Sequence, residues 1–365
     1  MASGQGRNYT KSFLKRLTLK VGSCMKMIEF DYDLPEHAIA QFPAEPRDSA
    51  RLLVDQGSHI APLHAHVKDL TDYLEPGDLL VVNETKVIPA RIPLVKETGG
   101  LAEVLLLEPQ GDVWEAMVKP GRRLKAGTKL RSPRDPALIV EVGEETSRGR
   151  RLVSIIHDGK KISGLNEISA LDKAGEMPLP PYIKNYEGSS KERYQTVYAK
   201  KLGSAAAPTA GLHFTDELIE NISLKGIEIA TVELTIGIDT FQPITVSDSD
   251  DHVMHSESYN VPDVTWNACQ SAKRVVAVGT TTVRSLESAA RGNLSGRTDL
   301  FLSRGEKFEI VDCIFTNFHL PKSSLLLMID SFVGERWRRL YSEALAEGYR
   351  FLSYGDAMFL QKAFD

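Results

Sequence analysis

Cysteine is scarce in this chain of 365 residues: Cys24, Cys269 and Cys313 are far apart, and no CxxC pair occurs. This excludes a disulfide framework and a cysteine-based zinc site, and isolated thiols are typical of a reducing cytosol. Runs of about 18 apolar residues are also missing, so no membrane-spanning segment is expected. We therefore expect a cytoplasmic protein, whose hydrophobic content of 42% is sufficient for a sizeable core.

Several nucleotide and hydrolase motifs are missing too. Neither GxGxxG nor GxxxxGK[ST] occurs, so a phosphate-cradling loop of either kind is not expected. The absence of GxSxG argues against an α/β-hydrolase triad. His64 and His66 have the spacing of a metal pair, but no third ligand is evident, and no metal site is predicted.

Positive charge is not in excess, since the formal net charge is −5 and the pI is near 6.0. This balance is unusual for a dedicated nucleic-acid binder. The segment 117–134, however, has seven basic residues and no acidic one. It is either a solvated loop or a patch that contacts phosphates. Its members are Lys119, Arg122, Arg123, Lys125, Lys129, Arg131 and Arg134.

The first 27 residues form a basic leader, because no acidic residue precedes Glu29. Basic, serine-containing leaders resemble organelle transit peptides, but an upstream extension or a misplaced start is the interpretation we favour, since Met25 and Met27 precede the patterned region. In either case residues 1–27 are expected to be disordered and to lie outside the catalytic fold.

The pattern after the leader predicts two domains. Short strands separated by turn signals, with no helical periodicity, predict a small β-barrel inserted at 71–156. The flanking segments 28–70 and 157–365 alternate between strand and helix, which predicts a three-layer α/β catalytic domain. Within it, helices are predicted at 216–224, 264–273, 282–291, 324–332 and 335–347, and strands at 226–234, 274–278 and 308–315.

Four polar clusters lie where apolar segments end, which is where a rigid scaffold usually holds a site. We expect them to form one composite active site. They are AAPTAGLHFT at 206–215, VGTTTVRSLESA at 278–289, TNFHLPKSSLL at 316–326 and YRFLSYGDAM at 349–358.

Two of these clusters predict particular chemistry. Thr280, Thr281 and Thr282 begin a helix, where hydroxyls and free N–H groups bind a phosphate or a carboxylate, unless the threonines only cap the helix. Arg284 is close enough to add a bidentate contact to a carboxylate. Asp356 is an acid–base group, an anchor for a hydroxylated or cationic ligand, or a turn residue with local hydrogen bonds.

Three histidines, His213, His255 and His319, lie at predicted element boundaries. A lone histidine is more often structural, but three of them beside polar residues favour a functional role for the set. His255 is followed by Glu257 two residues later.

The order of these strings closely resembles one family, the S-adenosylmethionine:tRNA ribosyltransferase-isomerases of the queuosine pathway. The resemblance covers about residues 28–360, and AAPTAGLHFT and TNFHLPKS are its most specific parts. The other strings are DYDLPEHAIAQFPAEPRDSARLLV, LLVVNETKVIPAR, KPGRR, MPLPPYI, ERYQTVYA, MHSE, VGTTTVRSLESA and YRFLSYGDAM.

The resemblance implies an α/β domain interrupted by a β-barrel. It also implies that the ribosyl moiety of S-adenosylmethionine, a consumed substrate, is transferred to 7-aminomethyl-7-deazaguanine at the wobble position of tRNAs with GUN anticodons. Isomerisation then gives epoxyqueuosine-tRNA, adenine and methionine. No metal or redox cofactor is implied, and we expect a monomer.

Roles for individual residues follow as hypotheses from this chemistry, since it needs a base at the 5′ carbon and a proton donor for adenine. His213, His319 and Asp356 are the catalytic candidates. Donor or base binding is expected of Phe214, Thr280, Thr281, Thr282, Arg284, Asn317, Phe318, Lys322 and Tyr354. Contact with tRNA is expected of Asn83, Lys119, Arg122 and Arg123.

One segment departs from the family pattern. LTIGIDTF stands where LHVGLGTF is expected, so that Thr235 replaces a histidine and Asp239 a glycine. If that histidine is catalytic in the family, a non-catalytic or altered tRNA-binding homologue becomes the alternative. An RNA methyltransferase lacks support because the glycine-rich loop is missing, and a ribosyltransferase for free nucleotides would not need the basic patch.

Overall fold

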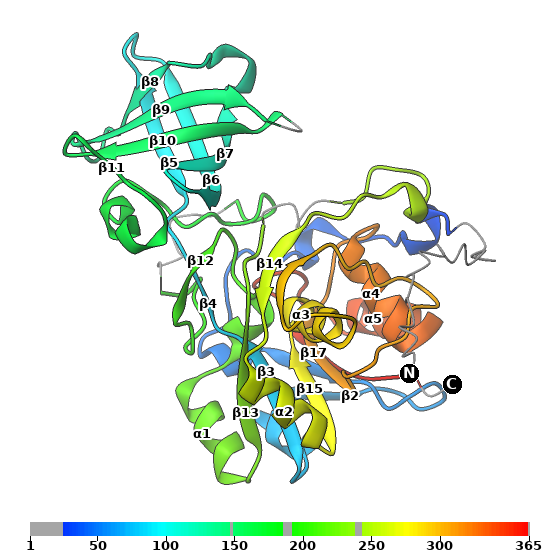
Figure 1. Ribbon diagram of the computed structural model, residues 1–365. Helices are drawn as coiled ribbons and strands as arrows, with labels where there is room; N and C mark the ends of the chain where they lie inside the picture. Colours follow the sequence, from blue (N-terminus) through cyan, green and yellow to red (C-terminus); the bar gives the residue numbers. More distant parts are fainter. Residues whose placement is uncertain (1–24, 147–148, 185–191, 238–242, 364–365) are drawn as a thin grey trace, which may run out of the picture.

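The computed structural model describes residues 25–146, 149–184, 192–237 and 243–363, which form a large α/β unit and a β-barrel that projects from it (Figure 1). The α/β unit is built on a nine-stranded mixed sheet. In spatial order its strands are β16 (Ser295–Thr298), β14 (Glu257–Asn260), β13 (Glu228–Leu234), β3 (Asp78–Asn83), β15 (Arg274–Val278), β17 (Cys313–Asn317), β18 (Ala357–Gln361), β1 (Arg51–Val54) and β2 (Leu63–His66).

Both faces of this sheet are covered, so the predicted three-layer α/β architecture is confirmed. In β3, Leu79 and Val81 belong to one core, whereas Leu80 and Val82 belong to the other. A strand buried on both faces has a continuous apolar run, and the LLVV of β3 has this form. The helices are α1 (Asp216–Leu224), on the second face, and α2 (Asp263–Ser271), α3 (Thr280–Ala290), α4 (Ser324–Val333) and α5 (Trp337–Ala346), on the first.

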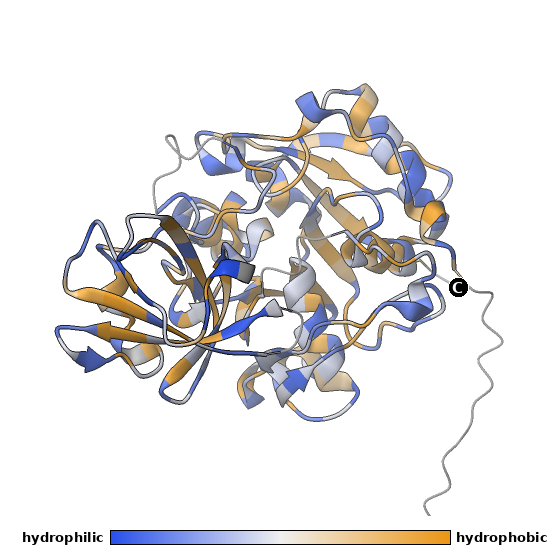
Figure 2. Cartoon of the chain, turned by 90° about the horizontal axis from the view of Figure 1, so that it is seen from above, coloured by the Kyte–Doolittle hydropathy of each residue, from blue (hydrophilic) through white to orange (hydrophobic). Residues whose placement is uncertain are grey.

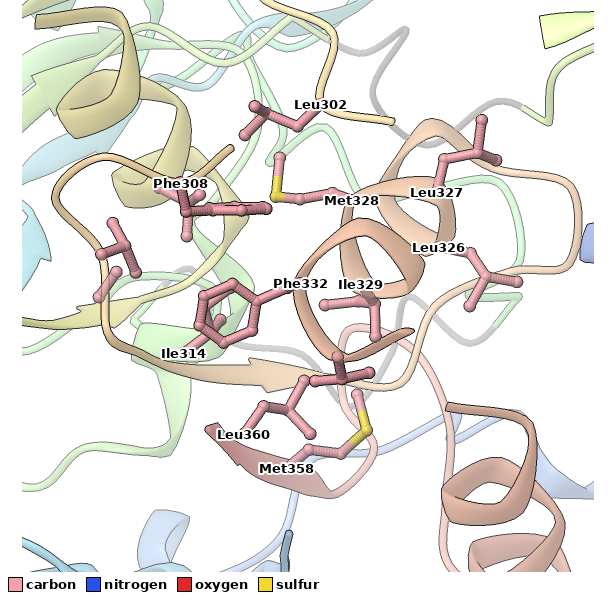
Figure 3. Packing of buried hydrophobic residues seen from close by; sticks show 14 of the residues in the cluster. Leu302, Phe308, Ile314, Leu326, Leu327, Met328, Ile329, Phe332, Met358 and Leu360 are labelled. Carbon is pink, nitrogen blue, oxygen red and sulfur yellow. The ribbon is translucent and has the colours of Figure 1, made fainter. Parts of the chain in front are cut away.

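Helix α4 shows how the first face is packed (Figure 3). Its Met328 and Phe332 point toward Phe308, and the rings of Phe332 and Phe308 meet edge to face with centroids 4.8 Å apart. Aromatic pairs in this geometry contribute about 0.5–1.5 kcal/mol beyond the area they bury. Ser323 caps the helix, since its Oγ accepts a hydrogen bond from the N–H of Leu326 at 3.2 Å.

The second sheet closes on itself as an antiparallel barrel, because β10 pairs with both β7 and β9. Trp114 is fully buried in its core. Hydrophobic residues concentrate on the strands of both sheets (Figure 2). The barrel strands are β5 (Arg91–Lys96), β6 (Leu101–Gln110), β7 (Val113–Lys119), β8 (Lys129–Arg131), β9 (Leu138–Glu145) and β10 (Arg151–His157), and β11 (Lys160–Lys161) extends the sheet beyond the closed ring.

The expected barrel limits, 71 and 156, differ from the observed sheets. Strand β3 belongs to the large sheet, and the pair formed by β4 (Thr85–Val87) and β12 (Lys201–Ser204) lies apart from both. At the other end, Ile168 and Leu171 pack into the barrel core. The sequence pattern missed this because β3 pairs with β13 and β15, which are far from it in the sequence.

Most of the predicted leader, residues 1–24, lies outside the described residues. Its last residues belong to the fold, contrary to the expected limit at residue 27. Met27 is buried in the first core, and the backbone of Lys26 forms an isolated antiparallel β-bridge with that of Asp248.

The strand expected at 308–315 is shorter than predicted, since pairing is confined to β17. The backbone N–H groups of Glu309, Ile310 and Val311 donate instead to the buried carboxylate of Glu287. A side chain from α3 thus replaces the neighbouring strand as their partner. Among the described residues, no helix has the length and hydropathy that a membrane crossing requires.

Candidate active site

The carboxyl ends of four neighbouring parallel strands, β13, β3, β15 and β17, meet at one edge of the large sheet. In open α/β sheets this edge is the usual place for a ligand. A cavity opens here, which we name the histidine chamber, and its walls include Thr209, Thr281, Asn317, His319 and Ser353. Each of the four predicted polar clusters therefore contributes to one cavity.

The start of α3 forms one wall of this chamber. Gly279 precedes the helix with φ of 87°, a conformation that favours glycine. No side chain caps the helix, so its first N–H groups are available to an anion. Thr280 and Thr281 line the chamber, whereas the hydroxyl of Thr282 donates to the carbonyl of Val278 at 2.7 Å and is fully buried.

His319 lies in another part of the chamber wall, after β17. Its Nε2 is 3.2 Å from the hydroxyl of Thr316, and its carbonyl accepts a hydrogen bond from the hydroxyl of Tyr32. Burial lowers the pKa of His319 to about 3, because the charged imidazolium would lose its hydration. The ring is therefore neutral at physiological pH.

His213 does not line the chamber but lies directly behind it. The side-chain amide of Asn317 donates to its Nε2 at 3.0 Å, and the amide oxygen of Asn317 accepts from the hydroxyl of Thr209 at 3.2 Å. Burial lowers the pKa of His213 to about 4, although the nearby Asp356 carboxylate favours the charged form. His213 thus contacts the chamber through Asn317.

Asp356 is a buried anchor in this structure. Its Oδ1 accepts from the backbone N–H of Arg51 at 3.0 Å and from the guanidinium of Arg350 at 3.2 Å, while Oδ2 accepts from the N–H of Arg350 at 2.8 Å. It is not among the residues that line the histidine chamber. The carboxylate therefore ties the loop before β18 to the start of β1.

Replacing Asp356 with asparagine is expected to lower the free energy of unfolding by about 2–4 kcal/mol, because buried N–H groups lose a charged acceptor. The kcat of the folded variant should stay within about threefold of the parent value, as a turn-anchoring role implies. Urea unfolding and steady-state kinetics measure the two effects, with Asp33→Asn at an exposed position as the control. A large loss of kcat at unchanged stability would instead support the predicted catalytic role of Asp356.

A second cavity, which we name the arginine chamber, adjoins the first. Thr280, Thr281 and Leu325 line both. The arginine chamber has a volume of about 330 Å³ and contains Arg284 and Glu257 in its wall. These two side chains form an ion pair, and each is 5% exposed. The Oε1 atom of Glu257 also accepts from the N–H of Gly237 at 2.9 Å.

The third cavity, the barrel cleft, separates the sheet edge from the barrel. Its walls combine Glu115 and Arg150 of the barrel with Thr235 and Glu257 of the α/β unit. Arg297 of β16 bridges the two units through Glu108, at 2.6 Å. Thr235, the first departure from the family pattern, therefore faces the cleft, whereas Asp239 lies outside the described residues.

Several predicted binding residues are in the protein core. Phe214 packs edge to face on Phe315, and Phe318 stacks on Phe351 with centroids 4.6 Å apart. Tyr354 is buried beside Tyr194 and is not a wall residue of the chambers. Each ring has an aromatic partner, which accounts for its burial without a ligand. Phe318 still borders the histidine chamber.

Lys322 is also occupied, since its Nζ is 2.7 Å from the Asp31 carboxylate. Its backbone has φ of 53°, and its N–H donates to the carbonyl of Phe30. Lys322 therefore joins the β17–α4 loop to the N-terminal segment and is not a wall residue of either chamber.

The predicted tRNA contacts divide into two kinds. Asn83 is fully buried, and its amide donates to the carbonyl of Leu234 at 3.1 Å. The side chain therefore has no exposed surface in this structure with which to contact tRNA. Lys119 and Arg123, in contrast, are exposed at the end of β7 and just after it, and Arg122 belongs to the same short 3-10 turn.

Sequence reasoning missed some residues that line these cavities. Glu257 was noted only as a neighbour of His255, and Thr209, Tyr182 and Ser353 were not selected. The hydroxyl groups of Tyr182 and Ser353 are 2.7 Å apart. The strings MPLPPYI and YRFLSYGDAM contained both residues, but nothing local to either string indicated that they meet.

Taken together, the sheet edge and its chambers define an α/β enzyme with a ligand site at strand ends, to which a barrel with an exposed basic loop is attached. Residues 27–360 match the model of the queuosine biosynthesis protein family. The chain therefore belongs to this family.

Relatives of known name are similar over almost the full chain. A protein of Staphylococcus saprophyticus named S-adenosylmethionine:tRNA ribosyltransferase-isomerase is 45% identical over 92% of this chain and 100% of its own length. A protein of Moorella thermoacetica with the same name is 47% identical over the same shares. The crystal structure of S-adenosylmethionine tRNA ribosyltransferase from Thermotoga maritima is 35% identical, with a TM-score of 0.51, over 91% of this chain and 99% of that one.

Proposed function

We propose that this protein transfers the ribosyl moiety of S-adenosylmethionine to 7-aminomethyl-7-deazaguanine at the wobble position of tRNAs with GUN anticodons, and isomerises it to give epoxyqueuosine-tRNA, adenine and methionine. The observation that carries the proposal is the pair of joined chambers at the carboxyl ends of β15 and β17, in a chain of this family. We also propose that it acts as a monomer.

The donor fits the two chambers by its chemistry. Its carboxylate needs hydrogen-bond donors, which the free N–H groups and hydroxyls of Thr280 and Thr281 and the guanidinium of Arg284 supply. Thr282 helps indirectly, since its bond to Val278 fixes the first turn of α3. Asn317 supplies an amide in the wall beside them.

His319 is the proposed base for the proton at the 5′ carbon, which the neighbouring sulfonium acidifies. The lowered pKa of His319 keeps the ring in the neutral form that accepts a proton, and it also makes this ring a weaker base than an ordinary imidazole. His213 acts through Asn317, whose amide it orients. In this scheme, His213 is a positioning residue and Asp356 supports the loop beside it.

The acceptor base must leave the anticodon loop to reach the donor. The barrel cleft shares Glu257 and His255 with the arginine chamber, so it offers a route from the barrel to the donor. Lys119, Arg122 and Arg123 are proposed to contact tRNA phosphates.

The direct test incubates the purified protein with S-adenosylmethionine and tRNA bearing 7-aminomethyl-7-deazaguanine, followed by mass spectrometry of nucleosides and small molecules. Epoxyqueuosine with equimolar adenine and methionine is the expected result. S-adenosylhomocysteine as the product would indicate methyl transfer instead. Folded protein that binds this tRNA but releases no adenine would favour the non-catalytic alternative raised by Thr235 and Asp239.

The basic loop of the barrel gives a separate prediction. Replacing Lys119, Arg123 and Lys125 together with glutamine should weaken tRNA binding. It should also reduce the slope of the logarithm of the binding constant against the logarithm of the salt concentration by about one for each lost phosphate contact. The KM for S-adenosylmethionine should not change, since the donor chambers lie in the other unit. Filter binding at several salt concentrations measures the slope.

The matched control removes the same charge elsewhere. Lys68, Lys225 and Lys273 lie outside the barrel, and Lys225 and Lys273 precede β13 and β15 at the edge of the sheet opposite the chambers. Their triple glutamine variant should bind tRNA with the parent salt slope. Equal slopes for both triple variants would contradict a tRNA role for the barrel loop.

A further inference from the structure

Arg284 has an unusual environment for a buried guanidinium. It is 5% exposed, and its Nε has no hydrogen-bond partner among the described residues. Its Nη2 makes only long contacts, 3.3 Å to the carbonyl of Thr298 and 3.5 Å to that of His255. A buried N–H without an acceptor costs about 1–3 kcal/mol. The arrangement is therefore suited to an acceptor that arrives with a ligand.

Glu257 stands beside this guanidinium in the wall of the same chamber. It pairs with Nη1 of Arg284, and the N–H of Gly237 fixes its other oxygen. The chamber wall thus presents one buried positive group and one buried negative group side by side. The pair is neutral as a whole, so a ligand with a single charge would unbalance the site, whereas a zwitterion adds one charge of each sign and leaves it neutral.

We infer that the Arg284–Glu257 pair selects the zwitterionic amino-acid end of the donor, with Arg284 binding its α-carboxylate and Glu257 its α-ammonium group. This inference rests on the proposed function and adds the direction in which the donor lies. The amino-acid end occupies the arginine chamber, and the rest of the donor points past Thr280 and Thr281 toward the histidine chamber, whose volume of about 50 Å³ admits only part of an adenosine group in this structure. The ribose then lies near the start of α3, within reach of both chambers.

The assignment explains why the pair is buried at this place. An isolated buried ion pair contributes little to stability, because desolvation offsets its attraction. Within a ligand chamber, the same pair is preorganised, so that two charge-assisted hydrogen bonds form without reorganising the protein. Glu257 also links Arg284 to the segment that ends at Gly237, which borders the barrel cleft.

The test compares two ligands that are both neutral at sulfur and share the adenosine group. S-adenosylhomocysteine has the zwitterionic end, whereas 5′-methylthioadenosine has a methyl group instead. Isothermal titration calorimetry with the parent protein should show about 10- to 100-fold tighter binding of S-adenosylhomocysteine, as two charge-assisted contacts imply. Similar affinities would overturn the inference without any variant.

Two variants then assign the two charges. Glu257→Gln keeps the size of the side chain. It should lower the affinity for S-adenosylhomocysteine about 10-fold or more and should leave the affinity for 5′-methylthioadenosine within about twofold of the parent value. Decarboxylated S-adenosylmethionine has the ammonium group but lacks the α-carboxylate. The substitution Glu257→Gln should therefore weaken its binding, whereas Arg284→Lys should not. Glu144→Gln, at an exposed position of the barrel, is the matched control and should change none of these affinities.

The failures can be told apart. Equal weakening of both adenosine ligands by Glu257→Gln would show a structural role only, and unchanged binding of the decarboxylated ligand would show that Glu257 does not contact the ammonium group. Either outcome overturns the inference. If the parent protein forms epoxyqueuosine but does not discriminate between the ligands, the inference alone fails, whereas absence of both binding and adenine release would reject the proposed function as well.

Discussion

Replacing His319 with alanine is expected to reduce kcat by about 10²- to 10⁴-fold, the range typical for loss of a general base. His319 lines the chamber, and its imidazole is neutral because burial lowers its pKa to about 3. The KM for S-adenosylmethionine should change little, since the proposed carboxylate contacts come from α3. Single-turnover release of adenine from excess enzyme measures the chemical step directly.

Two controls limit the interpretation of this variant. His37→Ala removes an exposed histidine and should have the parent kcat. His213→Ala should reduce kcat less than His319→Ala, because His213 reaches the chamber only through Asn317. If folded His319→Ala protein releases adenine at the parent rate, the base must be another group.

The second large effect is a loss of stability at acid pH. His213 and His319 have folded-state pKa values of about 4 and 3, below the ordinary value of 6.5. Between these values the unfolded chain binds protons that the folded chain does not, so their stabilising contribution is complete above pH 6.5 and is lost as the pH falls. Each histidine is expected to reduce the free energy of unfolding by about 1.4 kcal/mol per pH unit within its window.

Urea unfolding of the parent protein and of the His213→Gln, His319→Gln double variant, at pH values from about 7.5 to 4.5, separates this effect from carboxylate titration. The double variant lacks both imidazoles, so the free energy of unfolding should fall less steeply with decreasing pH. Parallel curves for the two proteins would contradict the assigned pKa values. Glutamine retains hydrogen-bonding groups, which limits the loss of stability at neutral pH.

Much of the fold follows from local pattern. The helix predicted at 216–224 and the strand predicted at 274–278 have the observed limits. Thr215 accounts for the first of these, because its hydroxyl accepts from the N–H of Leu218 and begins the helix sharply. The barrel was predicted because its short strands alternate and its turns contain glycine and proline.

The limits of the units could not be predicted in the same way. Strand β3 lies between β13 and β15, so its neighbours are more than 140 residues away in the sequence. Its apolar run indicates burial on both faces but not which sheet it joins. The shortened β17 has a similar cause, since the partner of the preceding backbone is Glu287, from another helix.

The sequence by itself determined the classes of element, the β-barrel, the membership of the polar clusters in one site, and the family whose reaction we propose. Only the tertiary structure decided which members of each cluster face a chamber. Thr281 faces it and Thr282 does not, and Asn317 and His319 face it whereas Asp356 is buried as an anchor. The physical reason is that residue type and spacing act locally, whereas the direction and partners of a buried side chain depend on residues that are distant in the sequence. Glu257 and Arg284 are 27 residues apart, and only folding shows that they meet.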